Sequence, residues 1–172
     1  MRQGRRDGFR EFAAGRSGHL YRSACLLASG DTHLAEDLVQ ETLGRMYLLW
    51  GRISRVDNPA AYAQTVLVRV FLTHQRRRSA GERPVGEFPE PGGPPTVSGA
   101  DPALRLTLLE ALGRLAPKDR AVLVLRYWED RSVEETADAM KVSSAAVRTR
   151  SSRALTRLRE QLGGNLAEFA GH

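Results

Sequence analysis

Basic residues cluster in one short stretch of the chain, and no acidic residue interrupts them. The stretch runs from Lys141 to Arg159 and holds six basic side chains: Lys141, Arg148, Arg150, Arg153, Arg157 and Arg159. An arginine guanidinium can hold two phosphate oxygens, or the O6 and N7 atoms of a guanine in the major groove of DNA. An ordinary solvated helix would instead mix charges, because oppositely charged pairs four residues apart stabilise it. The one-signed charge favours a nucleic-acid interface over that ordinary surface.

The pattern of a helix-turn-helix surrounds this stretch. Ser132 followed by Glu135 fits a capping box, in which each side chain accepts a hydrogen bond from the other residue's backbone amide. Ser143 can cap a second helix. Small or apolar residues would let the two helices approach and would fill the corner between them: Ala137, Met140, Val142 and Val147. The pattern predicts two helices joined by a tight turn.

The second of these helices would present its polar side to a DNA duplex. We predict that the residues in contact with DNA are Ser143, Ser144, Arg148, Thr149, Arg150 and Arg153. One position departs from the usual pattern, because Lys141 occupies the turn site that often holds glycine. A left-handed backbone at this lysine would cost about 1 kcal/mol.

Length and composition exclude several classes of protein. The 172 residues leave room for one domain or two small ones, and the net charge of +6 favours an anionic partner. No apolar run approaches the ~20 residues of a membrane span, so we predict no membrane insertion. Cys25 is the only cysteine, which excludes internal disulfides, fits a reducing cytosol and predicts a buried, inert thiol. The four histidines lack metal-ligand spacing, and no catalytic motif is present, so we expect no enzyme, metal, cofactor or small-molecule substrate.

Residues 8–78 predict a first helical domain. Its clearest periodicity runs from Leu34 to Trp50, after a cap at Asp31 or Thr32. The polar side of this helix carries Asp37, Gln40 and Glu41. These residues could form an ordinary surface whose acids complement the helix dipole, or a docking face for a basic partner. Periodicity alone favours the ordinary surface.

The end of this domain is strongly basic. From Arg45 to Arg78 there are seven basic residues and one acidic residue, with a predicted loop over 51–57 and a capped helix starting at Asn58 and Pro59. Positive charge beside aromatic rings suits single-stranded nucleic acid. Trp50 and Tyr62 could equally belong to the hydrophobic core, and for each residue taken alone the core is the favoured interpretation.

Residues 79–100 separate this domain from a second one. The segment holds five prolines and five glycines without apolar periodicity, which is typical of a linker. Residues 101–165 then predict a second helical domain, with the apolar segment Ala121–Leu125 at its centre. The predicted fold is all-α: two small helical domains joined by a Pro/Gly-rich linker.

Three motifs, in this order, resemble the extracytoplasmic-function (group 4) sigma factors of the bacterial sigma-70 family. They are the segment Asp37–Thr42, the segment Ala111–Tyr127, and the helix-turn-helix with Val147–Arg150 and Arg153. The resemblance covers about residues 8–165. The family usually has Leu-Gly where this chain has Met140-Lys141, and often Gly-Thr where it has Ala145-Ala146.

The resemblance implies a promoter-specificity subunit of RNA polymerase with no catalytic residues. It implies that residues 8–78 form a sigma domain 2-like bundle, which docks on the β′ coiled coil through Asp37, Gln40 and Glu41 and opens the −10 element. The contacts with the unpaired −10 strand that it implies are Arg52, Arg55, Asn58, Tyr62, Arg69, Arg76 and Arg77. Residues 101–165 would form a sigma domain 4-like helix-turn-helix, which reads the −35 element and binds the β flap. An anti-sigma factor is one further candidate partner, and the expected location is cytoplasmic and nucleoid-associated.

Two other hypotheses stay open at this point. A stand-alone helix-turn-helix transcriptional regulator with an N-terminal sensing or interaction domain would bind duplex DNA tightly without polymerase, as a dimer on a palindrome. A polymerase-binding adaptor that no longer recognises DNA has Lys141 as its only support. Transcription with purified core polymerase distinguishes all three hypotheses.

Overall fold

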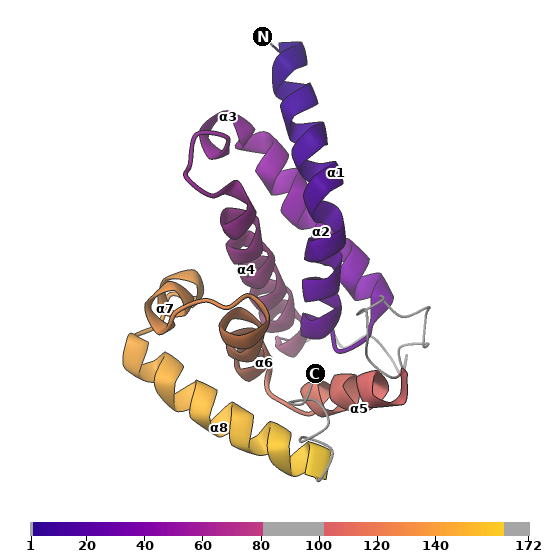
Figure 1. Cartoon of the computed structure of the whole chain (residues 1–172), viewed down its shortest axis with the longest axis vertical. Coiled ribbons are helices and arrows are strands. Elements are labelled where there is room, and N and C mark those ends of the chain that lie inside the picture. Colours follow the sequence, from indigo (N-terminus) through magenta and orange to yellow (C-terminus); the bar gives the residue numbers. More distant parts are fainter. Residues whose placement is uncertain (1, 81–101, 164–172) are drawn as a thin grey trace.

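Helices form all the regular structure in residues 2–80 and 102–163, the part of the chain that the computed structural model describes. The predicted all-α class is therefore confirmed (Figure 1). The predicted linker, 79–100, lies outside the described residues except for its first two positions. Of these, Ser79 is the last residue of α4.

The first half contains α1 (Arg2–Leu27), α2 (Thr32–Leu48), α3 (Trp50–Ile53) and α4 (Pro59–Ser79). Two predicted caps are confirmed: Asp31 Oδ1 accepts from the Leu34 amide at 3.1 Å, and Asn58 Oδ1 accepts from the Ala61 amide at 3.0 Å. The loop predicted over 51–57 is wrong at its start, where α3 forms. Trp50 and Ile53 are both buried, and one helical turn places two residues three apart on the same inner side.

The second half contains α5 (Pro102–Gly113), α6 (Pro117–Leu123), a π-helical turn η1 (Val124–Trp128), α7 (Val133–Met140) and α8 (Ser144–Leu162). The capping box is confirmed, because Ser132 Oγ and Glu135 Oε1 each accept the other residue's amide at 3.0 Å. These bonds lower the pKa of Glu135. Ser143 Oγ accepts from the Ala146 amide at 3.1 Å, as predicted. The helix-turn-helix therefore forms where its caps predict it.

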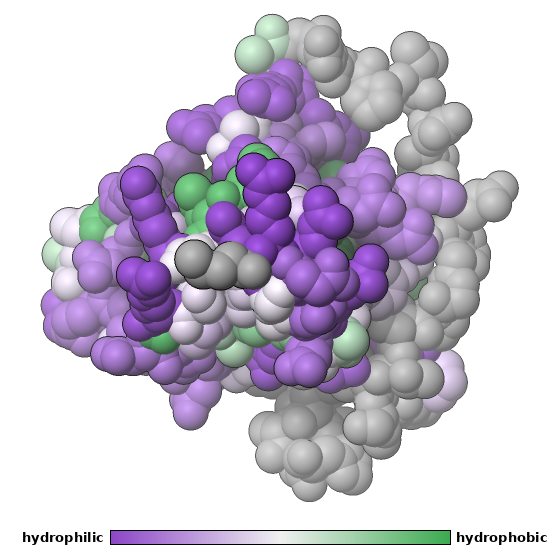
Figure 2. Space-filling model, turned by 90° about the horizontal axis from the view of Figure 1, so that it is seen from above, coloured by the Kyte–Doolittle hydropathy of each residue, from purple (hydrophilic) through white to green (hydrophobic). Residues whose placement is uncertain are grey.

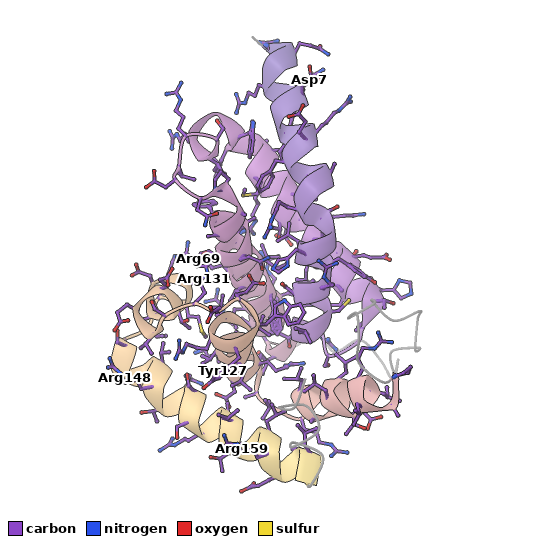
Figure 3. All side chains as sticks on the ribbon, in the orientation of Figure 1. Asp7, Arg69, Tyr127, Arg131, Arg148 and Arg159 are labelled. Carbon is purple, nitrogen blue, oxygen red and sulfur yellow. The ribbon has the colours of Figure 1, made fainter. Side chains whose placement is uncertain are left out.

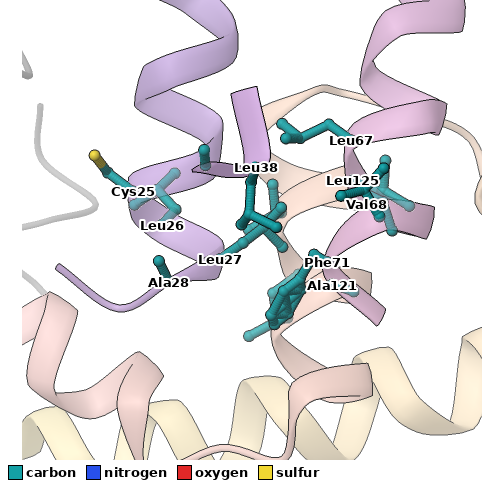
Figure 4. Packing of buried hydrophobic residues seen from close by; sticks show 14 of the residues in the cluster. Cys25, Leu26, Leu27, Ala28, Leu38, Leu67, Val68, Phe71, Ala121 and Leu125 are labelled. Atoms are coloured by element: carbon teal, nitrogen blue, oxygen red, sulfur yellow. The ribbon is translucent and has the colours of Figure 1, made fainter. Parts of the chain in front are cut away.

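The two halves pack against each other in this structure. Helix α4 lies beside α6 and α7 (Figure 1), and α1 contacts α6 and η1. Phe71 of α4, Ala121 of α6 and Leu125 of η1 are fully buried in one hydrophobic cluster that extends across both halves (Figure 4). Ala121–Leu125 is buried throughout, as its composition predicts. The first half covers part of this segment.

Cys25 lies in the same core, and 1% of its surface is exposed. Burial raises the pKa of its thiol to about 11. Relative to an ordinary cysteine, whose pKa is near 9.0, the thiolate population at neutral pH is then lower by about 100-fold. We therefore expect alkylation of the native chain by iodoacetamide to be slower than that of the urea-unfolded chain by at least this factor. Mass spectrometry of the two time courses measures the ratio, and equal rates would contradict the burial.

Candidate nucleic-acid and partner interfaces

Helix α8 carries the predicted duplex-reading residues along the outer edge of the second half (Figure 1). It packs on α5, α6 and α7 through an inner stripe of buried residues: Val147, Ser151, Ala154, Leu158 and Leu162. Arg148, Thr149 and Arg153 are exposed on its other side. The buried stripe thus fixes which side of α8 faces solvent, and three of the predicted contacts lie on that side.

The arginines of α8 differ in how firmly the chain holds them. The Arg148 Nη2 atom lies 3.5 Å from Glu134 Oε1, and both side chains are more than 60% exposed, so this pair is weak. Arg153 has no ion pair with any residue in the described segments. Arg150 is half-buried, and its Nη1 atom lies 3.2 Å from Oδ1 of the buried Asp119. Arg148 and Arg153 are thus accessible to DNA, while Arg150 also ties α8 to α6.

The two serines at the start of α8 have local roles. Ser143 uses its hydroxyl oxygen as the helix cap, and Ser144 is the half-buried first residue of the helix. A capping hydroxyl can still donate its proton to a phosphate oxygen, because only its lone pair is engaged.

Lys141 adopts the left-handed conformation that its place in the turn predicts, with φ 57° and ψ 45°. Glycine occupies this region without the steric cost that a Cβ atom brings, although it loses more entropy on folding. We expect Lys141→Gly to raise the free energy of unfolding by about 0.5–1 kcal/mol, which moves Tm upward by about 1–4 °C in a chain of this size. Calorimetry measures the change. Lys141→Ala is the matched control, because it removes the charge but keeps the Cβ atom, and an equal gain in that variant would contradict the strain.

The three predicted docking residues lie together on an open surface. Asp37, Gln40 and Glu41 are exposed on α2, while Leu38 and Val39 on the other side of the helix are buried. Glu41 Oε1 accepts from Arg45 Nη2 at 2.8 Å, in a pair whose members are both about half exposed. The surface is therefore acidic, hydrophilic and accessible to a partner.

The short helix α3 and the start of α4 place four of the predicted single-strand contacts. Arg52 and Arg55 are exposed, Asn58 caps α4, and Tyr62 is half-buried against the core. Exposed apolar side chains, which sequence analysis missed, lie nearby in the chain: Tyr47, Leu48, Leu49 and Val56. Leu48 is 74% exposed although its helix is otherwise amphipathic. Seen from the end at which α1 begins, the surface is mainly hydrophilic with small hydrophobic areas (Figure 2).

Arg69, another predicted DNA contact, is half-buried and joins the two halves. Its Nε atom donates to the Ala139 carbonyl at 2.9 Å and its Nη2 atom to the Asp138 carbonyl at 3.2 Å, at the C-terminal end of α7. Arg131 connects the halves in the opposite direction. It belongs to the second half and donates to the Ala61 carbonyl and to Thr65 Oγ1 in α4 of the first half. Figure 3 shows the two arginines close together between α4 and α7. Arg76 and Arg77 stay exposed at the end of α4.

A second polar cluster, also missed by sequence analysis, connects α1 to the end of η1. Glu129 Oε1 lies 2.7 Å from His19 Nε2 and accepts from Ser23 Oγ at 2.7 Å. Trp128 Nε1 donates to the same serine at 3.1 Å. Elsewhere between the two halves, Arg120 is 7% exposed and lies 5.5 Å from the Phe71 ring centroid, and burial lowers its pKa to about 10. The partners in the α1 cluster are about a hundred positions apart in the sequence, and Arg120 and Phe71 are about fifty apart, so no local pattern predicts these contacts.

Two absences apply to residues 2–80 and 102–163, the described part of the chain. No group of three or more His, Cys, Asp or Glu side chains there could hold a metal ion. None of the helices in those segments combines the length and hydrophobicity that a membrane span needs.

The chain matches two family models whose order follows the two predicted domains. Residues 16–81 match the model described as Sigma-70 region 2, and residues 111–160 match Sigma-70, region 4. The RNA polymerase sigma-E factor of Streptomyces coelicolor is 40% identical over 155 residues, which cover 90% of this chain and 85% of that protein.

Solved structures resemble the chain over most of its length. The sigma factor RpoE of Bartonella quintana, solved in complex with the anti-sigma factor NepR, has a TM-score of 0.71 and 24% identity, covering 92% of this chain and 98% of that one. The extracytoplasmic function sigma factor SigJ of Mycobacterium tuberculosis has a TM-score of 0.57 and 27% identity, covering 94% of this chain and 58% of that one.

Proposed function

This chain belongs to the extracytoplasmic-function group of the bacterial sigma-70 family, and we propose that separate surfaces perform its work as a sigma factor. As a sigma factor, it binds core RNA polymerase and directs promoter-specific initiation of transcription. One observation carries this assignment of surfaces. Arg148, Thr149 and Arg153 are exposed on α8, whereas the acidic surface lies on a different helix, α2.

Helix α8 reads the −35 element as a duplex in this proposal. Its exposed arginines can each hold a guanine edge or a phosphate, and Thr149 lies between them with a hydroxyl and a methyl group for base contacts. Arg150 has both a structural and a DNA-binding role, since its guanidinium forms an ion pair with Asp119 of α6. It orients α8 and approaches only the DNA backbone.

Residues around α3 hold the opened −10 element in this proposal. Arg52 and Arg55 bind phosphates, while Tyr62 and the exposed Leu48 and Val56 contact unstacked bases. Removing a base from the stack costs a few kcal/mol, which apolar contact and phosphate binding can offset. Arg76 and Arg77 extend this basic surface along α4, and Arg69 would join it when the two halves separate.

The acidic surface of α2 is the proposed docking site for the β′ coiled coil of core polymerase. Asp37, Gln40 and Glu41 offer carboxylates and an amide to a basic partner. An anti-sigma factor is a further proposed partner, supported by the fold shared with the Bartonella sigma factor that was solved with one. We place the protein beside DNA and polymerase in the cytoplasm.

Run-off transcription tests this proposal against the two other hypotheses. Purified core polymerase would be incubated with genomic fragments, with and without this chain. Transcripts from discrete start sites that require the chain are the expected result. Tight duplex binding without polymerase and without initiation would instead support a stand-alone regulator, and binding to polymerase without selection of start sites would support an adaptor.

A further inference from the structure

A basic cavity of about 980 Å³ lies between the two packed halves. The first half contributes Arg45, Arg69, Arg76 and Arg78 from α2 and α4. The second half contributes Lys118, Lys141 and Arg150 from α6, the turn after α7, and α8. No acidic side chain lines the cavity among the described residues. The cavity is therefore strongly electropositive, and both halves build it.

The charge of this cavity is only partly balanced within the chain. Arg45 is paired with Glu41 and Arg150 with Asp119, whose carboxylates lie outside the lining. Arg78, Lys118 and Lys141 have neither an ion pair nor a side-chain hydrogen bond with any residue of the described ranges. Like charges around one concave space repel each other, although solvent screens the exposed Lys118 and Lys141. An anion in the cavity would remove the repulsion.

The rest of the lining suits the non-phosphate part of an organic ligand. Leu72, Met140 and Val142 supply apolar surface, while Thr73 and Gln75 supply hydroxyl and amide groups. Small-molecule sites are typically about 300–1,000 Å³, with apolar walls and a few polar groups that fix orientation. Arginines bind phosphate oxygens in pairs, and lysines bind them as point charges.

We propose that this cavity binds a nucleoside polyphosphate, with the phosphates among the arginines and lysines and the base against the apolar wall. The ligand would contact both halves at once and so stabilise their packed arrangement. Arg76 is also a proposed contact for DNA, so the ligand and the −10 strand would compete for it. The site depends on the cavity alone, and its failure would leave the assignment as a sigma factor intact.

Calorimetric titration of the full chain with GTP, ATP and inorganic tripolyphosphate, at ~0.15 M salt, tests the proposal. We expect saturable binding at one site, with a nucleotide bound more tightly than tripolyphosphate because the apolar wall contacts the base. The double variant Arg78→Glu, Lys118→Glu changes one cation in each half and should weaken nucleotide binding at least ~10-fold. Lys118→Glu alone, at an exposed position, should weaken it in the same direction and provides a variant with little risk of misfolding.

The matched control is Arg6→Glu, Arg10→Glu, which makes the same change in net charge at two exposed positions of α1. Equal losses in both double variants would overturn the site, because the binding would then reflect net charge only. Arg131→Ala provides a second test, because it loosens the packing of the halves without touching the cavity lining. It should weaken nucleotide binding as well. Unchanged nucleotide affinity in that variant would overturn the proposal that the ligand contacts both halves at once.

A labelled single-stranded oligonucleotide serves as the competitor. We expect the nucleotide to displace it partly from the native chain and much less from the Arg78, Lys118 double variant. Saturable binding of the oligonucleotide alone, with none for GTP, ATP or tripolyphosphate, would overturn the proposal and assign the cavity to nucleic acid. Tripolyphosphate binding as tightly as both nucleotides would overturn the role of the base.

Discussion

Reversing two charges on α2, in the variant Asp37→Lys, Glu41→Lys, is expected to abolish the association of this sigma factor with core RNA polymerase. Both carboxylates are exposed and lie one helical turn apart on the proposed docking surface. Two lysines there would face a basic partner surface, and the juxtaposition of like charges across an interface costs several kcal/mol. We expect association to weaken by at least ~100-fold, as measured by co-purification with core enzyme and by gel filtration.

Helix α1 offers a closely matched control for this variant. Asp7 and Glu11 are also exposed, also four residues apart on a helix, and Asp7→Lys, Glu11→Lys makes the same change in net charge. This control should associate with polymerase as the native chain does. Circular dichroism would establish that both variants keep their helix content. Unchanged co-purification of the Asp37, Glu41 variant would refute the docking surface.

Local rules were sufficient to predict where four helices of this chain begin. Asp31, Asn58, Ser132 and Ser143 each cap a helix at the predicted place, because a capping side chain bonds to an amide only three residues away. The left-handed backbone at Lys141 also follows from a local requirement. A helix-turn-helix needs a sharp turn at that position, whichever residue occupies it.

Elements that depend on distant contacts were not predictable in the same way. Trp50 and Ile53 fold into the short helix α3 because the core buries both of them, and a four-residue helix has too few residues to display a periodicity. The π-helical turn η1 also follows a segment whose apolar residues are buried on all sides. A continuous apolar run indicates burial but not the hydrogen-bond pattern.

The role of Arg69 illustrates why the candidate site was harder to predict than the fold. A basic residue in a basic stretch indicates phosphate binding, yet the same guanidinium binds backbone carbonyls at the end of α7 with two hydrogen bonds. Nothing in the sequence near Arg69 shows whether its guanidinium binds phosphate or backbone carbonyls, because the carbonyls belong to residues about seventy positions later. The same applies to Arg131, which binds α4 in the reverse direction.

Arginine on α8 presents the same ambiguity, and here exposure and pairing divide the residues. Arg150 and Arg157 both approach the buried Asp119, with nitrogen–oxygen distances of 3.2 Å and 3.7 Å. A carboxylate that is 8% exposed orients the guanidiniums that it holds, so these two residues contribute to the packing of α8 on α6. Arg148 and Arg153 lack such an anchor, which leaves them as the stronger candidates for base contacts.

Removing either of these arginines should therefore weaken use of the −35 element and spare binding to polymerase. A good arginine–guanine contact contributes about 1–3 kcal/mol of discrimination, so Arg148→Ala or Arg153→Ala should each reduce −35-dependent run-off transcription by about 5- to 150-fold. Templates with an intact and with a scrambled −35 element isolate that dependence. Arg159→Ala is the control, since Arg159 is also exposed but lies in the last turn of α8, away from the end that is proposed to enter the groove. Poor binding to core enzyme with normal promoter selectivity, in either test variant, would assign this helix to polymerase instead of DNA.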